Sequence, residues 1–269
     1  MNQNIKSGEL FTPFSDLTEL LINLVKKLPN KPSIKVAFLG YQDLLLPNER
    51  WIQLMSIEKF KELRIRPNSE KILKIHKKVS VEIVPEIDSV IAAIFGNKVK
   101  VDTFDFTKYY GTEIIHDFNY PIPKKFNQKY DIVMDYGTTE HIFDYAQALK
   151  NMYSMTNLDG LICHVGPFDM FNHGFYGLNP TLFHDFYEDN GCSTENAMVF
   201  DFVPDQSSPT KYRQVQFKIP NYDRVRIRMN PEIQKISEIS IAYLVRKNSH
   251  FPVPNIPIQQ KYRNKELWM

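Results

Sequence analysis

The chain has 269 residues, of which 43% are hydrophobic and 24% are charged, an ordinary composition for a globular protein. Its formal net charge of +2 is too small to predict nucleic acid or an anionic membrane as a partner, and its longest early apolar run, LLINLV, is too short to span a bilayer. Two cysteines, Cys163 and Cys192, and an N-terminus without a signal pattern favour a cytoplasmic location.

The first part of the chain alternates helix and strand patterns. Apolar residues at helical spacing predict a helix over 16–28, with Asp16 near its start and two lysines near its end. The buried run IKVAFL then predicts a strand over 34–39 that ends at Gly40. The patterns that follow predict a helix over 51–65, a helix over 88–95 and a strand over 98–104, whereas 68–80 gives no clear pattern.

The middle of the chain holds two short apolar runs that each end in an acidic residue. EIIHD ends at Asp117, and YDIVMD ends at Asp135. The next predicted elements are a helix over 140–157, closed by Asn157-Leu158-Asp159-Gly160, a strand over 161–165 and a helix over 180–190. Asn179 is a good cap for the last of these helices, and Gly191 is a good stop.

Strand patterns dominate the end of the chain, over 197–203, 215–219, 225–229 and 239–245. Alternation of strands and helices predicts a mainly parallel sheet with helices on both faces. We divide the chain into a helical extension (1–32), a main domain (33–247, with an insertion at 204–236 before the last strand) and an irregular tail (248–269). In the insertion, strand alternation puts Arg224, Arg226 and Arg228 on one face, which could recognise an anion or simply be solvated.

Three residues at predicted strand ends are candidates for ligand binding. Parallel strands present their carboxyl ends at one edge, where α/β folds hold ligands, so this layout indicates a nucleotide-like ligand. Gly40 would let the backbone approach a ligand, or it forms a tight turn. Asp105 would hold ribose hydroxyls, with Asp102 as the rival for that role, or it is a surface turn residue. Asp117 would accept a hydrogen bond from an exocyclic amine of the ligand, or it caps the following turn.

The segment from Asp135 to His141 joins a strand end to a predicted helix start. His141 is a candidate general base near the crevice, or a histidine with a structural role. The loop 165–183, with Asn172 and His173, would shape a substrate pocket over the crevice, or it packs under the sheet edge. Metal ligation is the alternative use of the side chains of this region, but no pair has a metal-specific spacing, so we predict no metal site. The residues of suitable type are His116, Asp117, Asp135, Glu140, His141 and His173.

The stretch from VDTFDF to NPTLF, with its GTTEHIF and HGFYGLNP segments, resembles class I S-adenosylmethionine-dependent methyltransferases. The resemblance covers roughly residues 34–192. It implies a Rossmann-like three-layer α/β sandwich with a mostly parallel, seven-stranded sheet and an antiparallel edge. It also implies that Gly40 lies under the methionine part of the cofactor, that Asp105 holds the ribose and that Asp117 lies near the adenine. Asp135, Tyr136 and Gly137 would line the cofactor and substrate side.

The leading hypothesis is methyl transfer from S-adenosylmethionine to an oxygen or nitrogen of a small molecule or glycan, with His141 or His173 removing the acceptor proton. The usual glycine-rich loop is reduced here to Gly40-Tyr41-Gln42-Asp43. This departure motivates a second hypothesis, a non-catalytic scaffold of the same fold. A third is a metal-assisted hydrolase that uses His116, Asp117 and His141. The sequence leaves the acceptor and the oligomeric state open.

Overall fold

The structure is a computed structural model that describes residues 17–28, 31–76, 81–108, 114–205, 208–216, 239–259 and 262. The predicted strand over 225–229 and its three arginines lie outside the described residues, as does most of the strand predicted over 215–219. For 200–205 and 208–216 only the backbone is considered.

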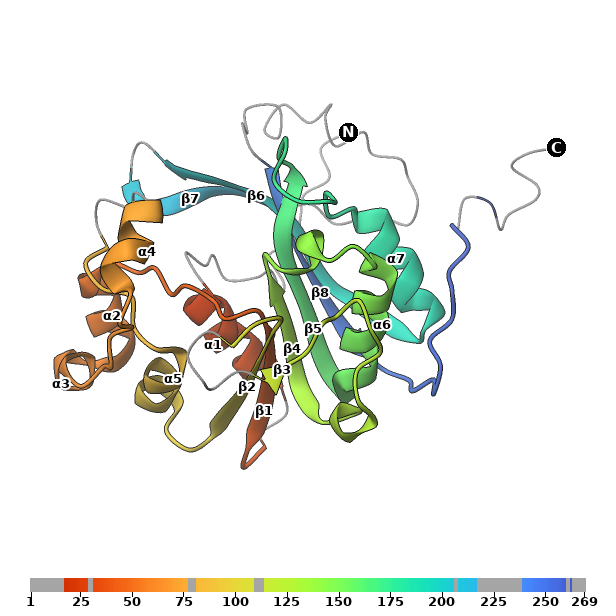
Figure 1. Cartoon of the computed structure of the whole chain (residues 1–269), viewed down its shortest axis with the longest axis horizontal. Coiled ribbons are helices and arrows are strands. Elements are labelled where there is room, and N and C mark those ends of the chain that lie inside the picture. Colours follow the sequence, from red (N-terminus) through yellow and green to blue (C-terminus); the bar gives the residue numbers. More distant parts are fainter. Residues whose placement is uncertain are drawn as a thin grey trace, which may run out of the picture.

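The described strands form one sheet with the order β3-β2-β1-β4-β5-β8-β6-β7 (Figure 1). They are β1 (Ile34–Leu39), β2 (Val99–Asp105), β3 (Ile114–Ile115), β4 (Tyr130–Tyr136), β5 (Thr156–Asp169), β6 (Cys192–Asp205), β7 (Ser208–Gln216) and β8 (Ile239–Lys247). The pairs from β3 to β5 are all parallel, whereas β8 is antiparallel to both β5 and β6, and β7 is antiparallel to β6.

The predicted Rossmann-like sheet, mostly parallel and with an antiparallel edge, is confirmed. Its seven strands are extended by β7, which lies in the segment that we expected to be an insertion. The last strand, β8, is not at the edge; it fills the gap between β5 and β6. Its run ISIAYLVRK is buried almost throughout, as expected for a strand covered on both faces.

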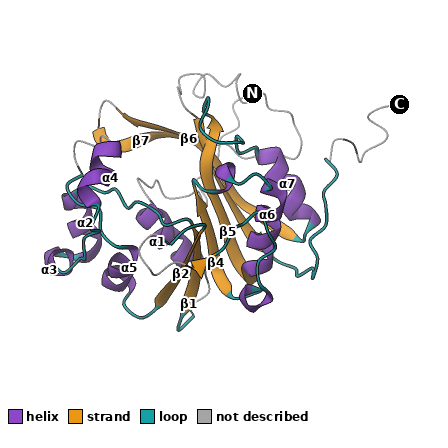
Figure 2. Ribbon diagram, in the orientation of Figure 1, coloured by secondary structure: helices purple, strands orange, loops and turns teal. Residues whose placement is uncertain are grey.

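Helices cover both faces of the sheet and make three layers (Figure 2). They are α1 (Leu17–Lys27), α2 (Asn48–Met55), α3 (Ile57–Lys61), α4 (Ser69–His76), α5 (Ile87–Phe95), α6 (Tyr145–Met155) and α7 (Pro180–Asp189). Successive side chains of β1 point to opposite faces, so Val36 and Phe38 join the core under α1, α2 and α5. Ala37 and Leu39 join the core under α6 and α7.

Three local predictions differ from the structure. The helix predicted from Glu140 begins at Tyr145, because Asp144 caps it by accepting from the Gln147 N–H, and Thr139–His141 forms a separate 3-10 turn, η2. Residues 157–160 do not close that helix, since β5 already begins at Thr156. The helix predicted over 51–65 is two short helices, α2 and α3, separated by Ser56 at φ 83°. The unplaced region 68–80 contains α4.

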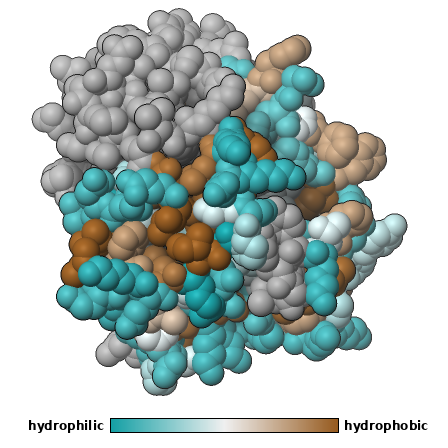
Figure 3. Space-filling model, turned by 60° about the vertical axis from the view of Figure 1, so that its left-hand side comes forward, coloured by the Kyte–Doolittle hydropathy of each residue, from teal (hydrophilic) through white to brown (hydrophobic). Residues whose placement is uncertain are grey.

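The side of the molecule formed by α2 to α5 mixes hydrophobic and hydrophilic surface (Figure 3). The exposed isoleucines Ile57, Ile65 and Ile75 belong to this side. Among the described helices, none is long and apolar enough to cross a membrane.

Candidate active site

The polar residues predicted at strand ends lie along one edge of the sheet. The strand register places Leu39 beside both Phe104 and Asp135, and Asp135 beside His164. Gly40 and Asp105 follow this row directly, Gly137 follows the last residue of β4, and Asp117 lies two residues after the end of β3. The sequence prediction that these residues share one edge is therefore met by the topology.

The loop after β1 is held tightly by its own chain. Gly40 has φ +77°, and a Cβ placed on it would lie 2.6 Å from Oγ1 of Thr138. Thr138 Oγ1 and Gln42 Nε2 each donate to the Leu39 carbonyl, both at 2.8 Å. The room that glycine provides is thus used by side chains of the protein itself, and the loop has a fixed shape.

Tyr41 fixes this loop from its other side. Its N–H donates to Asp105 Oδ2 at 3.0 Å, and the Arg66 guanidinium lies 4.7 Å from its ring centroid. Burial raises the pKa of Tyr41 to about 12, although the charge of Arg66 opposes the shift, so the phenol stays neutral. Arg66 also forms an ion pair with Asp43.

The two acidic candidates at the ends of β2 and β3, Asp105 and Asp117, differ in the hydrogen bonds that they accept. Asp105 is half-buried and accepts one backbone N–H on each oxygen, from Tyr41 and Thr107. Since a carboxylate has about four acceptor sites, Asp105 keeps acceptor capacity for a further partner. Asp117 Oδ1 accepts from the backbone and side chain of Asn119, at 2.9 and 2.8 Å, so it caps the turn that follows β3.

Asp135 is enclosed and is used to shape the turn after β4. Only 1% of the residue is exposed. Its Oδ1 accepts from the N–H groups of Thr138 and Thr139, and its Oδ2 accepts from the Thr139 hydroxyl and from His164 Nδ1 at 3.0 Å. Four donors saturate a carboxylate. We therefore assign Asp135 a positioning role in place of the direct ligand contact predicted from the sequence.

The hydrogen bonds continue from Asp135 into the core. His164 is fully buried, stacks on Phe183 at a centroid distance of 4.4 Å, and its Nε2 lies 2.7 Å from the Tyr187 hydroxyl. If His164 carries its proton on Nδ1 and the Tyr187 hydroxyl donates to Nε2, every polar group in this series of hydrogen bonds has a partner. Sequence reasoning missed His164, although a lone polar residue within the apolar run LICHV was a visible signal.

A second buried carboxylate, that of Glu140, faces two histidines. Glu140 is 0% exposed, and its Oε1 lies 3.6 Å from His173 Nε2 and 3.9 Å from His141 Nε2. The two imidazole rings are 5.4 Å apart and are about half exposed. The loop after β5 brings His173 to this position, because the Phe175 N–H donates to the Glu140 carbonyl at 2.8 Å.

The electrostatics of this cluster follow from burial. Burial, and then the nearby charge of Asp135, raises the pKa of Glu140 to about 8. Burial and the neighbouring His173 lower the pKa of His141, and the charge of Asp135 opposes that shift. His141 is therefore neutral near pH 7 and has a ring nitrogen able to accept a proton.

Of the remaining predicted site residues, some lie beside the Glu140 cluster and others do not. Gly137 is exposed at φ +78°, between the Asp135 turn and Glu140, whereas Tyr136 is half-buried and packs against the core under α1. His116 does not join the histidine pair; its Nε2 lies 3.2 Å from the Tyr120 carbonyl. Among the described residues, the group with the proximity of metal ligands is Glu140, His141 and His173, without His116 or Asp117.

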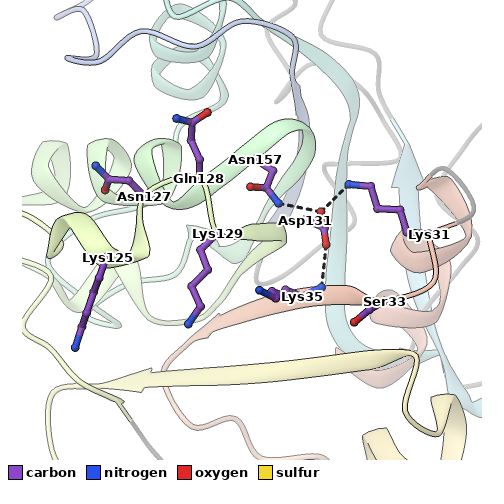
Figure 4. Close-up of a pocket in the computed structure, with 9 residues that line it drawn as sticks. All are labelled: Lys31, Ser33, Lys35, Lys125, Asn127, Gln128, Lys129, Asp131 and Asn157. Atoms are coloured by element: carbon purple, nitrogen blue, oxygen red, sulfur yellow. Dashed lines mark hydrogen bonds and ion pairs between the residues drawn. The ribbon is translucent and has the colours of Figure 1, made fainter.

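A separate basic hollow of about 450 Å³ lies at the opposite edge of the sheet, where β1, β4 and β5 begin (Figure 4). Lys31, Lys35, Lys125 and Lys129 line it. Asp131 partly neutralises it, since it accepts from Lys31 and from the Lys35 N–H. Its position is remote from the strand-end row, so it is not the predicted crevice.

Neither a family model nor a curated protein matches the chain. Solved structures that match include the CurJ carbon methyltransferase, with 8% identity and a TM-score of 0.46 over 87% of this chain and 54% of that chain. A SAM-dependent methyltransferase from Archaeoglobus fulgidus has 15% identity and a TM-score of 0.41, over 86% and 94% of the chains. A Burkholderia thailandensis N1-methyltransferase with bound S-adenosylhomocysteine has 9% identity and a TM-score of 0.39, over 81% and 72%.

The chain thus spans about half the length of the CurJ enzyme. These matching proteins are methyltransferases, the class that the sequence resembles.

Proposed function

We propose that the protein is an S-adenosylmethionine-dependent methyltransferase that acts on a small molecule or glycan. The observation that carries the proposal is the convergence of Gly40, Asp105, Asp117 and Gly137 at one edge of a Rossmann-like sheet, with His141 and His173 beside them. Ligands of open α/β sheets bind outside the carboxyl ends of the strands, so a cofactor bound there would lie next to the acid–base groups.

The residues present fit the cofactor best at its ribose end. Asp105 would accept the ribose hydroxyls, because its carboxylate keeps acceptor capacity, and Asp117 would lie near the adenine. Gly40 would lie under the methionine part once the Thr138 and Gln42 side chains beside it move aside, and the exposed Gly137 would line the cofactor and substrate side. When bound, the cofactor supplies an activated methyl group for in-line transfer, for which the protein contributes mainly positioning.

His141 would take the proton from the acceptor hydroxyl or amine, and His173 is the second candidate. The lowered pKa and the half-exposed ring of His141 leave a neutral nitrogen accessible near the carboxyl ends of the strands. The test uses methyl-labelled S-adenosylmethionine with pooled hydroxyl- and amine-bearing small molecules and glycans. His141→Ala is expected to lose roughly 10²–10⁴-fold in turnover while still binding S-adenosylhomocysteine. Unchanged turnover in this variant would remove His141 from the chemistry.

One observation favours the second candidate function, a non-catalytic scaffold. Thr138 and Gln42 already occupy the space beside Gly40 and saturate the Leu39 carbonyl. A scaffold of this kind would not bind the cofactor, so it differs from the enzyme in the simplest binding measurement.

A further inference from the structure

Glu140, His141 and His173 bring three good metal ligands to one point. One ligand atom from each lies within 4.8 Å of the others. The separations of 3.6 and 3.9 Å from Glu140 Oε1 to the two Nε2 atoms are too long for hydrogen bonds. They approach the roughly 3.3–3.5 Å that separates ligand atoms placed about 2.0–2.2 Å from a tetrahedral ion.

The state of the Glu140 carboxylate is an independent sign that a ligand is missing. The side chain is fully buried, and neither oxygen accepts a well-formed hydrogen bond from another described residue; the group that approaches it is the backbone N–H of Glu140 itself. A buried polar group left without a partner costs about 1–3 kcal/mol, and a charged one costs more. Asp135, five residues earlier, has four donors. The chain therefore satisfies one buried carboxylate and leaves the other directed at two imidazoles.

Three glycines lie around the Glu140 side chain. A Cβ on Gly137 would lie 3.6 Å from Oε1, and one on Gly166 would lie 3.5 Å from Oε2. A Cβ on Gly174 would lie 3.0 Å from Cγ of Glu140. A larger residue at Gly137 or Gly166 would pack against a carboxylate oxygen, so glycine at these places leaves the carboxylate uncovered by a Cβ.

We propose that Glu140, His141 and His173 bind one divalent transition-metal ion, of which Zn²⁺ best suits two imidazoles and a carboxylate. Catalytic zinc sites commonly have three protein ligands and keep a further position open. Both imidazoles are half exposed, so the ion has a path from solvent and an open side toward the crevice.

Binding of the ion does not depend on the proposed function, but its role does. At this place it would bind the acceptor oxygen and lower the pKa of that oxygen, as metal ions do with bound water. His141 would then be a ligand instead of a free base, and the acceptor proton would pass to solvent. Chelator treatment separates the two cases, because it abolishes turnover only if the ion is required.

The test titrates Zn²⁺ alone, and Co²⁺ as a visible-light probe, into the chelator-stripped full chain in a calorimeter. Glu140→Gln and His173→Ala are the test variants, and His250→Ala, an exposed histidine away from the cluster, is the matched control. Circular dichroism verifies folding of each variant. We expect one equivalent of ion to bind wild type and the control, and both test variants to lose at least the roughly 10–100-fold in affinity that loss of an outer-shell partner costs.

Absence of binding to the folded wild type, or binding that survives both test substitutions, would overturn the proposal. The failures of the two proposals are distinguishable. A protein that binds S-adenosylhomocysteine but no metal ion contradicts only this site, whereas one that binds Zn²⁺ but no S-adenosylhomocysteine contradicts the methyltransferase.

Discussion

Gly40 has a backbone conformation that a side chain would strain, and it also lies against Thr138. Its φ is +77°, and a Cβ would approach Thr138 Oγ1 to 2.6 Å. Gly96 is a matched control, since it has φ +59° and nothing within 4 Å of a Cβ position. Strain of this kind costs about 1–3 kcal/mol. We expect Gly40→Ala to lower the free energy of unfolding clearly more than Gly96→Ala does, as measured by urea titration.

Equal losses in the two variants would mean that Thr138 moves aside at no cost, and that the loop after β1 is softer than its hydrogen bonds indicate. That result would also weaken the case for a scaffold that fills its own cofactor space.

Tyr187 ends the buried chain of hydrogen bonds that begins at Asp135. Removing its hydroxyl leaves His164 Nε2 buried without a donor. Such a loss costs about 1–3 kcal/mol, so Tyr187→Phe should lower the thermal midpoint by several degrees. Tyr120→Phe, at a residue that is 66% exposed, serves as the control and should change little. A Tyr187→Phe variant as stable as the control would contradict the assigned role of His164.

At the residue scale, sequence reasoning reached the residues at strand ends and missed their partners. An acidic residue after an apolar run is visible in the sequence, as Asp105 and Asp117 were. The pairing of Asp135 with His164 depends on the register between β4 and β5, which no local pattern encodes. The contact of His173 with Glu140 depends on a backbone hydrogen bond from the loop, which is equally invisible.

At the scale of elements, Asp131 joins the beginnings of three strands. Asp131 lies in β4 and accepts from the side chain of Lys31, which precedes β1, and from the backbone N–H of Lys35 in β1. It also accepts from the side chain of Asn157, the second residue of β5. Burial acts to raise the pKa of the Asp131 carboxyl, but these hydrogen bonds outweigh it and lower that pKa. The ionised form therefore stabilises the fold.

Asp131→Asn should destabilise the protein by about 1–3 kcal/mol at pH 7, with a loss that depends on pH. Because the folded pKa is depressed, the stabilisation is fully present above the unfolded pKa of about 3.9 and disappears as pH falls through the folded value. Urea titrations of wild type and variant at about pH 7, 5 and 3 give the difference between their free energies of unfolding. We expect that difference to shrink only at the lowest pH. A difference that stays constant with pH would show that the charge of Asp131 contributes nothing.

Elements with strong periodicity were predictable, and those whose limits depend on capping or tertiary contacts were not. The strand over 34–39 agrees with β1, and the helix over 180–190 agrees with α7 to one residue. The helix predicted from Glu140 was wrong at its start, since Thr139 and Glu140 are buried in the turn that Asp135 organises. Residues 157–160 look like a turn, but β5 passes through them, with φ +61° at Asp159.

At the scale of the whole molecule, the sheet separates two chemically different edges. The carboxyl edge gathers the strand-end acids, the glycines and the Glu140–His141–His173 cluster. The amino edge carries the lysine-lined hollow beside Asp131. The parallel arrangement of β1 to β5 brings the site residues from Gly40 to His141 to one end of the strands, although they are distant in sequence. The central claim is that the carboxyl edge binds a methyl-donor cofactor.

The measurement that tests this claim most directly is a calorimetric titration of the folded protein with S-adenosylhomocysteine, repeated on Asp105→Ala. Asp189→Ala, at the far end of α7, is the control for loss of an acidic side chain. We expect micromolar binding by wild type and Asp189→Ala, and its loss in Asp105→Ala. No heat from a folded wild-type protein at high ligand concentration would contradict it and leave the non-catalytic scaffold as the function.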